Sequence, residues 1–160
     1  MNGEFRTGIG YDKHRLIAGG PLVLGGIPID FDKKLSGHSD GDVLLHAVVD
    51  ALLGAAALGD IGTHFPDTDP RWKNANSEIF LRHALGLTRK KVSITFLDCI
   101  ILAEKPKLAP HFDAIRAKLA TLLDLTIDKI SLKAKTEEGL GDIGSCNAMA
   151  AFVAITVKLT

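Results

Sequence analysis

The longest apolar run of the chain extends from Val43 to Leu58, and only His46 and Asp50 interrupt it with ionisable side chains. A bilayer-spanning helix needs about 20 predominantly apolar residues, so this run is too short and too polar to cross a membrane. The run predicts a helix over residues 40–58 that belongs to the core of a globular protein.

Both ends of this helix carry boundary signals. Ser39 is a suitable N-cap, and Asp42 follows it three residues later, as in a capping box. Gly59 stops the helix at its other end.

A polar stripe runs along this apolar helix. Asp42, His46 and Asp50 are spaced four residues apart, so their side chains lie on one side of it. Burying such groups without partners costs several kcal/mol, so each needs a partner. Two interpretations are open for His46: a core histidine that is bonded to a neighbouring carboxylate, or a metal ligand that an aspartate orients.

The remaining segments alternate between strand and helix patterns in one uninterrupted domain over residues 1–160, without repeats or linkers. This order predicts an α+β fold, with a mixed β-sheet and helices packed on one of its faces. We expect strands over 5–11, 22–24, 27–29, 92–103, 130–134 and 148–159, further helices over 77–87 and from Pro110 to 122, and a loop over 63–74.

Composition narrows the class of partner. The 19 basic and 19 acidic side chains cancel, so no net charge draws the chain to nucleic acid or to an anionic membrane. Two cysteines, Cys99 and Cys146, cannot staple a scaffold, and they predict buried thiols in a reducing compartment. No apolar signal core occurs in residues 1–7, so we expect a cytoplasmic protein.

Asp12 and His14 favour the metal interpretation. They lie two residues apart at the end of a predicted strand, so both side chains leave on the same face. Gly8 and Gly10 precede them and allow another backbone to approach closely. Together with His46 they make three nitrogen and oxygen ligands, the number found in a catalytic zinc site that keeps one position open.

The segment before the central helix either caps the helix or binds a phosphate. Ser39 and Asp40 are typical capping residues. His38 precedes a helix N-terminus, where the backbone amides and the helix dipole favour an anion. A phosphate group fits this position.

Four further segments are ambiguous from composition alone. Asp60–Gly62 and Phe65–Asp69 are typical of solvated turns, or of a flap that closes over a substrate. Ala103–Ala109 is either a plain connector or a segment that offers backbone groups and lysines to a base or a phosphate. Lys135–Gly139 is either an exposed turn or a contact for a phosphate and a hard cation such as Mg²⁺.

Taken together, these motifs resemble the 2-C-methyl-D-erythritol 2,4-cyclodiphosphate synthases of the non-mevalonate isoprenoid pathway. The resemblance covers nearly the whole chain, and its most specific part is the run from His38 to Pro70. The matching blocks are Gly8–His14, Gly25–Ile27, His38–His46, Asp50–Gly62 and Phe65–Pro70.

The resemblance implies a homotrimer with active sites between neighbouring subunits, and a reaction that cyclises a cytidine diphosphate ester of methylerythritol 2-phosphate and releases CMP. It implies Zn²⁺ on Asp12, His14 and His46, and a second ion, Mg²⁺ or Mn²⁺, on Glu138. His38 and Thr136 match residues that stabilise the transition state. The residues that match substrate contacts are Asp12, Lys13, His14, His38, Ser39, Asp60, Ile61, Gly62, Phe65, Pro66, Asp67, Thr68, Asp69, Ala103, Pro106, Lys107, Leu108, Ala109, Lys135, Thr136, Glu137 and Glu138.

The chain departs from this family near its C-terminus. Lys135, Asp142 and Ser145 stand where relatives commonly have a threonine, an aromatic residue and an arginine. The last two differences remove an apolar ring and a cation. Two other functions therefore stay open: a zinc-dependent phosphohydrolase that uses water as nucleophile, and a trimeric nucleotide-binding scaffold without turnover.

Overall fold

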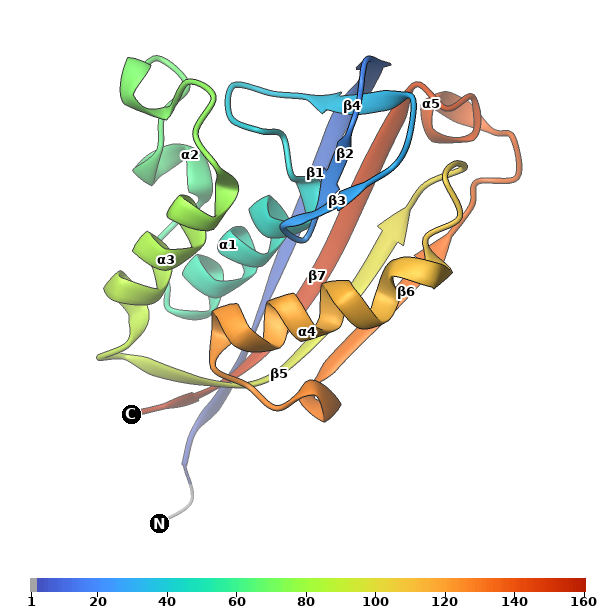
Figure 1. The fold of residues 1–160 in the computed structure, drawn as a ribbon. Coiled ribbons are helices and arrows are strands. Elements are labelled where there is room, and N and C mark those ends of the chain that lie inside the picture. The colour runs from blue at the N-terminus through green and yellow to red at the C-terminus, as the bar shows by residue number, and fades with distance from the viewer. Residues whose placement is uncertain (1–2) are drawn as a thin grey trace.

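The computed structural model describes residues 3–160, so Met1 and Asn2, which begin the expected domain, lie outside the described part. Its main sheet has five strands in the order β4-β1-β7-β5-β6. β5 and β6 are parallel and all other neighbours are antiparallel, which confirms the predicted mixed sheet (Figure 1). The strands are β1 (Phe5–Ala18), β4 (Lys33–Ser36), β5 (Val92–Leu102), β6 (Ile130–Lys135) and β7 (Ala148–Leu159), and a separate hairpin joins β2 (Leu22–Leu24) to β3 (Ile27–Ile29).

The three long helices cover one face of this sheet, as predicted (Figure 1). They are α1 (Val43–Ala55), α3 (Ser77–Thr88) and α4 (Phe112–Leu123). Along β7 the odd-numbered residues from Met149 to Val157 are fully buried beneath them. The other face of the sheet carries no long helix in the described part of the chain; only the four-residue helix Gly141–Gly144 packs there, with Ile143 against Ala148 and Ala150.

Two glycines let α1 lie directly on β1. A Cβ atom at Gly8 would lie 1.9 Å from the carbonyl oxygen of Ala51, and one at Gly10 would lie 1.9 Å from that of Ala47. No side chain fits at such distances, so the glycines set the depth of α1 over the sheet.

β1 is longer than the predicted strand over residues 5–11. It continues through Ala18, and its pairing with β7 runs without a break from Phe5 opposite Lys158 to Arg15 opposite Ala148. The polar run that follows Tyr11 stays in the strand because β7 pairs with β1 as far as Arg15, and β4 pairs with it from Arg15 to Ala18. Asp12 and His14 therefore lie inside the strand, on the same face as the two glycines.

The start of α1 differs from the prediction. The N-cap is Asp42, whose side chain accepts from the backbone N–H groups of Leu44 and Leu45, and Ser39 lies outside the helix. The N-terminal amides that the sequence offered to a phosphate are therefore bound by a carboxylate of the chain itself.

Asp42 also binds the β2–β3 hairpin. Its two carboxylate oxygens accept from the N–H groups of Gly25 at 2.9 Å and Gly26 at 2.7 Å, where both glycines have positive φ. The side chain is fully buried, and burial raises its pKa to about 6, so it is ionised at neutral pH. One carboxylate thus fastens the hairpin to the helix.

Several short elements escaped prediction because a single turn has no measurable periodicity. The loop expected over 63–74 contains one of them, and the helix expected from Pro110 begins as a 3₁₀ turn before α4. These elements are α2 (Ile61–His64), α5 (Gly141–Gly144) and the 3₁₀ turns η1 (Pro70–Trp72), η2 (Ala109–His111) and η3 (Ile127–Lys129).

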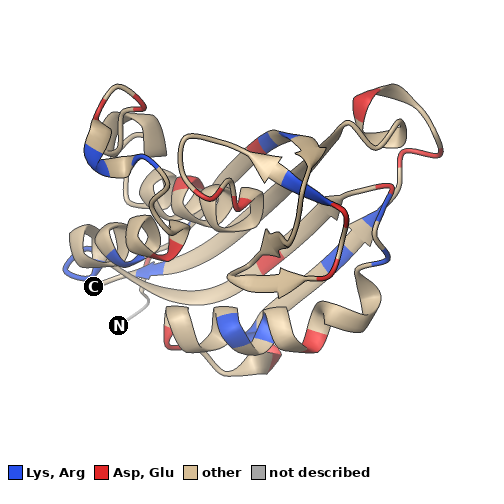
Figure 2. Cartoon of the chain, turned by 45° about the horizontal axis from the view of Figure 1, so that its top comes forward, with Lys and Arg blue, Asp and Glu red and all other residues tan. Residues whose placement is uncertain are grey.

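The cysteine prediction is right for one residue only. Cys99 is buried, and burial raises the pKa of its thiol to about 12, whereas Cys146 is half-buried. Over residues 3–160, no helix combines the length and the apolarity that crossing a bilayer requires. Residues of both charge signs lie along the helices and loops (Figure 2), whereas β5 and β7 carry one charged residue each, Asp98 and Lys158.

We expect Asp42→Asn to destabilise the fold. The amide has one acceptor oxygen in place of two, so buried N–H groups lose their partner at a cost of about 2–4 kcal/mol. Asp113→Asn is the matched control, since Asp113 also lies in a first helical turn but its side chain is 97% exposed. Urea unfolding should leave the control within about 0.5 kcal/mol of the parent. An equally small change for Asp42→Asn would contradict this role.

Candidate metal centre

Three side chains converge where β1 passes beneath α1. Asp12 Oδ2 lies 2.9 Å from His14 Nε2 and 2.9 Å from His46 Nδ1. The two ring nitrogens are 3.1 Å apart. The structure thus brings together the residues for which the sequence predicted a metal site.

The fold explains this convergence. Alternate residues of β1 face α1, so Asp12 and His14 follow Gly8 and Gly10 on the buried side. His46 lies one turn after the N-cap of α1 and is 9% exposed. A carboxylate and two imidazoles therefore meet at a mostly buried position.

The hydrogen bonds of His14 leave a lone pair on the converging nitrogen. His14 Nδ1 donates to the carbonyl oxygen of Ser36 at 2.8 Å, since a carbonyl only accepts. In the neutral ring, Nε2 then carries no proton and faces Asp12. Electron-rich atoms that face one another at this distance favour a positive charge between them.

The pKa values of Asp12 and His14 also favour a positive charge at this position. Burial raises the pKa of Asp12, but hydrogen bonds from His14 and His46 outweigh it, and the pKa lies well below its usual range. The hydrogen bond to Asp12 raises the pKa of His14, against the effect of burial. This position thus favours a positive charge, and a metal ion that binds here displaces any proton shared by these atoms.

The geometry fits a zinc ion. A tetrahedral ion with bonds of about 2.0–2.1 Å separates its ligand atoms by about 3.3 Å. The three observed separations are 2.9, 2.9 and 3.1 Å. Two imidazoles and a carboxylate are ligands that zinc takes, and three protein ligands leave one position open.

A cavity of about 210 Å³ adjoins the three ligands. Aromatic rings form one of its walls: the ring centroids of Phe65 and Phe80 are 4.7 Å apart, and those of Phe65 and Trp72 are 5.2 Å apart. Phe65 is 7% exposed and packs into the protein, whereas Pro66, Asp67 and Thr68, which follow it, are exposed. The lining also includes five of the predicted substrate contacts, namely His38, Ser39, Ile61, Phe65 and Asp67.

Other residues of the 60–69 region support this wall from outside the cavity. Asp60 caps α2, accepting from the N–H and the hydroxyl of Thr63 at 2.8 and 2.7 Å. Asp69 caps η1 and pairs with Arg71. Gly62 lies within α2, and Pro66 and Thr68 are exposed on the loop.

The polar stripe on α1 has a different use at each position. Asp50 accepts from the backbone N–H of Ile61 at 2.7 Å, which ties α2 to α1. Neither Asp42 nor Asp50 orients His46, contrary to the expected aspartate partner. The outer nitrogen of His46 contacts the hydroxyl groups of Ser77 and Ser39 instead.

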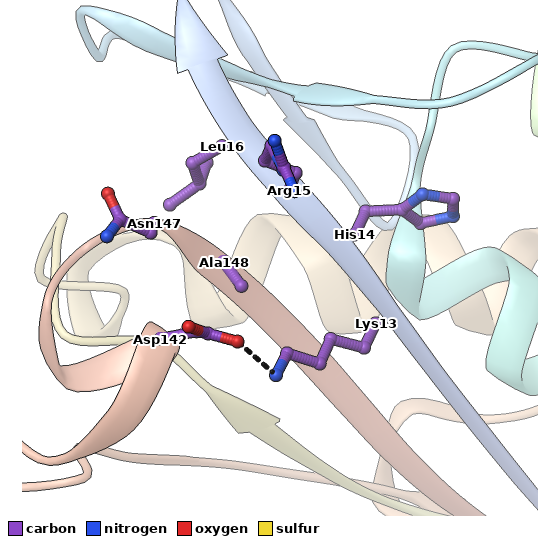
Figure 3. A pocket seen from close by; sticks show the side chains of 7 residues that line it. All are labelled: Lys13, His14, Arg15, Leu16, Asp142, Asn147 and Ala148. Carbon is purple, nitrogen blue, oxygen red and sulfur yellow. Dashed lines mark hydrogen bonds and ion pairs between the residues drawn. The ribbon is translucent and has the colours of Figure 1, made fainter.

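Lys13 points away from the cavity. Its amine pairs with Asp142 Oδ2 at 3.1 Å, whereas the His14 ring lies on the α1 side of β1 (Figure 3). Lys13 and Asp142 line a second pocket of about 540 Å³. Its other lining residues are His14, Arg15, Leu16, Asn147 and Ala148.

The remaining predicted site residues form a second group at the carboxyl ends of β5 and β6. Ala103 N–H donates to the carbonyl oxygen of Lys135 at 2.9 Å, which joins the segments 103–109 and 135–138. Within the second segment, the Thr136 hydroxyl donates to Glu138 at 2.5 Å. Pro106, Lys107, Leu108 and Ala109 follow in the first segment, and Glu137 lies between Thr136 and Glu138.

Within a single chain, this second group lies apart from Asp12, His14 and His46. The pairing registers align Lys13, Ala150, Leu102 and Lys135 in one row across the sheet. β1 and β6 are three strand spacings apart in this row, which is about 14 Å. The two groups therefore lie at one level of the sheet but do not meet.

Three residues at the centre were not predicted. Trp72 and Phe80 line the cavity, and Ser77 contacts His46. In the sequence, Ser77 showed only as the start of a helix, and the aromatic residues showed only as members of a loop and a helix face. No local pattern pointed to their meeting.

Comparison with known proteins identifies the relatives of this chain. Residues 5–158 match the YgbB family. The 2-C-methyl-D-erythritol 2,4-cyclodiphosphate synthases of Burkholderia mallei (strain SAVP1) and Burkholderia pseudomallei (strain K96243) are each 54% identical over 142 residues, which are 88% of this chain and 88% of each relative.

Solved structures agree with this match. The bifunctional IspDF from Campylobacter jejuni superposes on 99% of this chain with a TM-score of 0.94 and 40% identity, and the chain spans 43% of the length of that protein. IspF of Plasmodium falciparum, in a complex with CDP, superposes on the whole chain and on 99% of its own length, with a TM-score of 0.86 and 35% identity.

Proposed function

Because this chain belongs to the YgbB family, whose curated relatives are 2-C-methyl-D-erythritol 2,4-cyclodiphosphate synthases and hence lyases, we propose that it converts 4-diphosphocytidyl-2-C-methyl-D-erythritol 2-phosphate to the 2,4-cyclodiphosphate and CMP. The observation that carries the proposal is the meeting of Asp12, His14 and His46 beside a cavity with an aromatic wall.

The proposed reaction is an intramolecular displacement at phosphorus. An oxygen of the 2-phosphate attacks the β-phosphorus and forms a new P–O bond. The bond from the β-phosphorus to the oxygen that bridges to the α-phosphorus breaks, and CMP leaves with that oxygen. Holding the two ends of the substrate in the ring-closing arrangement supplies much of the acceleration, about 7 kcal/mol or more in favourable systems.

The residues present fit two cations. A zinc ion held by Asp12, His14 and His46 supplies a Lewis acid that offsets phosphate charge. Glu138 is proposed to hold a second ion, Mg²⁺ or Mn²⁺, with the substrate diphosphate. Both ions serve one purpose, since the attacking and accepting groups are anions that repel each other.

The cavity suits the methylerythritol part of the substrate. Phe65, Trp72 and Phe80 offer an apolar wall that excludes water, which would otherwise compete as nucleophile. His38 and Ser39 line the cavity with polar groups that can bind phosphate or hydroxyl oxygens. We propose His38 and Thr136 as the groups that stabilise the transition state.

The face of the sheet opposite the three long helices supports a homotrimer. Its exposed apolar side chains include Ile9 at 65%, Tyr11 at 52% and Phe152 at 41% exposure. Tyr11 and Phe152 are cross-strand partners with ring centroids 6.4 Å apart, so the residues form a continuous patch. An apolar patch of this kind marks a protein interface, and we propose that three copies bury it against one another.

A trimer also completes the site. The metal ligands and the group around Thr136 and Glu138 lie at one level of the sheet, about 14 Å apart in one copy. Copies arranged around an axis place the β6 end of one beside the β1 of the next. We propose that the 103–109 segment of the neighbouring copy then binds the cytidine.

The departures near the C-terminus leave the metal centre intact. Asp142 forms an ion pair with Lys13, on the side of β1 away from the cavity (Figure 3). Ser145 is exposed and follows α5. Neither residue lines the cavity beside the metal ligands.

The reaction is tested with purified protein, the cytidine substrate and Mg²⁺ in H₂¹⁸O, with and without a zinc chelator. We expect CMP and the cyclic diphosphate in equal amounts, no ¹⁸O in either, and loss of both with the chelator. Incorporation of ¹⁸O would identify a hydrolase instead. Binding of a cytidine nucleotide without turnover would identify a scaffold.

The trimer is tested with Phe152→Lys, which places a charge in the apolar patch. We expect this variant to sediment as a monomer and to lose cyclisation while it keeps its zinc, because the second residue group comes from a neighbouring copy. Leu87→Lys is the matched control, since Leu87 is 39% exposed on α3, on the helical side of the sheet. A monomeric Phe152→Lys variant with full activity would show that one copy is sufficient.

A further inference from the structure

The outer nitrogen of His46 faces two hydroxyl groups. Ser77 Oγ lies 2.9 Å from His46 Nε2, and Ser39 Oγ lies 3.0 Å from it. Ser77 is fully buried at the first position of α3, whereas Ser39 is partly exposed and lines the cavity. Only Ser77 is thus held away from solvent and from a bound substrate.

The hydroxyl proton of Ser77 is committed to Asp40. Ser77 Oγ donates to a carboxylate oxygen of Asp40, and the Ser77 backbone N–H donates to the other oxygen at 3.1 Å. A carboxylate only accepts, and a serine hydroxyl has a single proton. Toward His46, Ser77 therefore presents a lone pair, and His46 Nε2 must carry the proton of this hydrogen bond.

This arrangement determines which nitrogen of His46 can bind a metal. In the neutral ring, a proton on Nε2 leaves the lone pair on Nδ1, the atom that lies 2.9 Å from Asp12 Oδ2. His14 is fixed in the complementary way by the carbonyl oxygen of Ser36. When both rings are neutral, as metal binding requires, each one thus points an unprotonated nitrogen at the same position.

We infer that Ser77, held by Asp40, is a positioning residue that fixes the tautomer and the orientation of His46 for metal binding. The inference rests on the proposed zinc site and adds a residue to it. Outer partners of metal-binding histidines typically contribute about 10- to 100-fold in metal affinity.

A purely structural role for Ser77 does not explain these contacts. The N-cap of α3 is Asn76, whose side chain accepts from the N–H of Glu78 at 2.8 Å, so the helix start does not need the Ser77 hydroxyl. Asp40 lies 37 positions earlier in the chain and also accepts from the Asp42 N–H. The Asp40–Ser77 contact thus links the start of α3 to the ligand on α1.

The experiment compares Ser77→Ala with Thr88→Val. Thr88 is another buried hydroxyl on α3, and it donates to the Ala84 carbonyl oxygen away from His46. Zinc affinity is measured by competition with a chromophoric chelator, and the protonation of His46 Nε2 by ¹⁵N-edited NMR of the zinc-loaded parent protein. We expect a zinc dissociation constant about 10- to 100-fold higher for Ser77→Ala, no change for Thr88→Val, and protonation of Nε2 in the parent.

Zinc affinity of Ser77→Ala within twofold of the parent would overturn the inference, and so would a His46 Nε2 that carries no proton in the zinc-loaded parent. The NMR result decides alone if Ser77→Ala does not fold. The experiments can contradict the inference about Ser77 without contradicting the proposed function, and the reverse. Tight zinc binding without a cyclic product contradicts only the function, whereas cyclisation with unchanged zinc affinity in Ser77→Ala contradicts only the role of Ser77.

Discussion

The contact between α1 and β1 is the constraint on which the site depends. Gly8 and Gly10 lie against the backbone of α1, and a Cβ atom at either would approach a carbonyl oxygen to 1.9 Å. This depth places His46 Nδ1 2.9 Å from Asp12 Oδ2, on the face of β1 that continues from the glycines. A larger residue would lift the helix, and the three ligand atoms would separate.

The buried and half-buried polar groups along α1 show how an apolar helix can carry a site. Asp42 caps the helix and binds the β2–β3 hairpin, His46 joins Asp12 and His14, and Asp50 holds α2. Each group has a hydrogen-bonding partner in another segment, which offsets the cost of its burial. The spacing of four residues therefore serves three separate contacts along one side of the helix.

The sequence predicted the parts of the fold that depend on periodicity. The strands predicted over 22–24, 27–29 and 148–159 agree with the structure because the residue pattern of a strand is a local property. The sequence did not predict the C-terminal part of β1, because polar residues there give no strand pattern. Pairing with β7 and β4 keeps this part in the strand. The metal ligands followed from spacing and residue type, but Ser77 did not, since its partner His46 lies 31 positions away and no local pattern records that contact.

The most direct test of the account is zinc X-ray absorption spectroscopy of the zinc-loaded protein. If Asp12, His14 and His46 hold the ion, the spectrum will show only nitrogen and oxygen neighbours at about 2.0–2.1 Å, with the outer scattering of two imidazole rings. A sulfur neighbour at about 2.3 Å, or scattering from one imidazole or none, would contradict it.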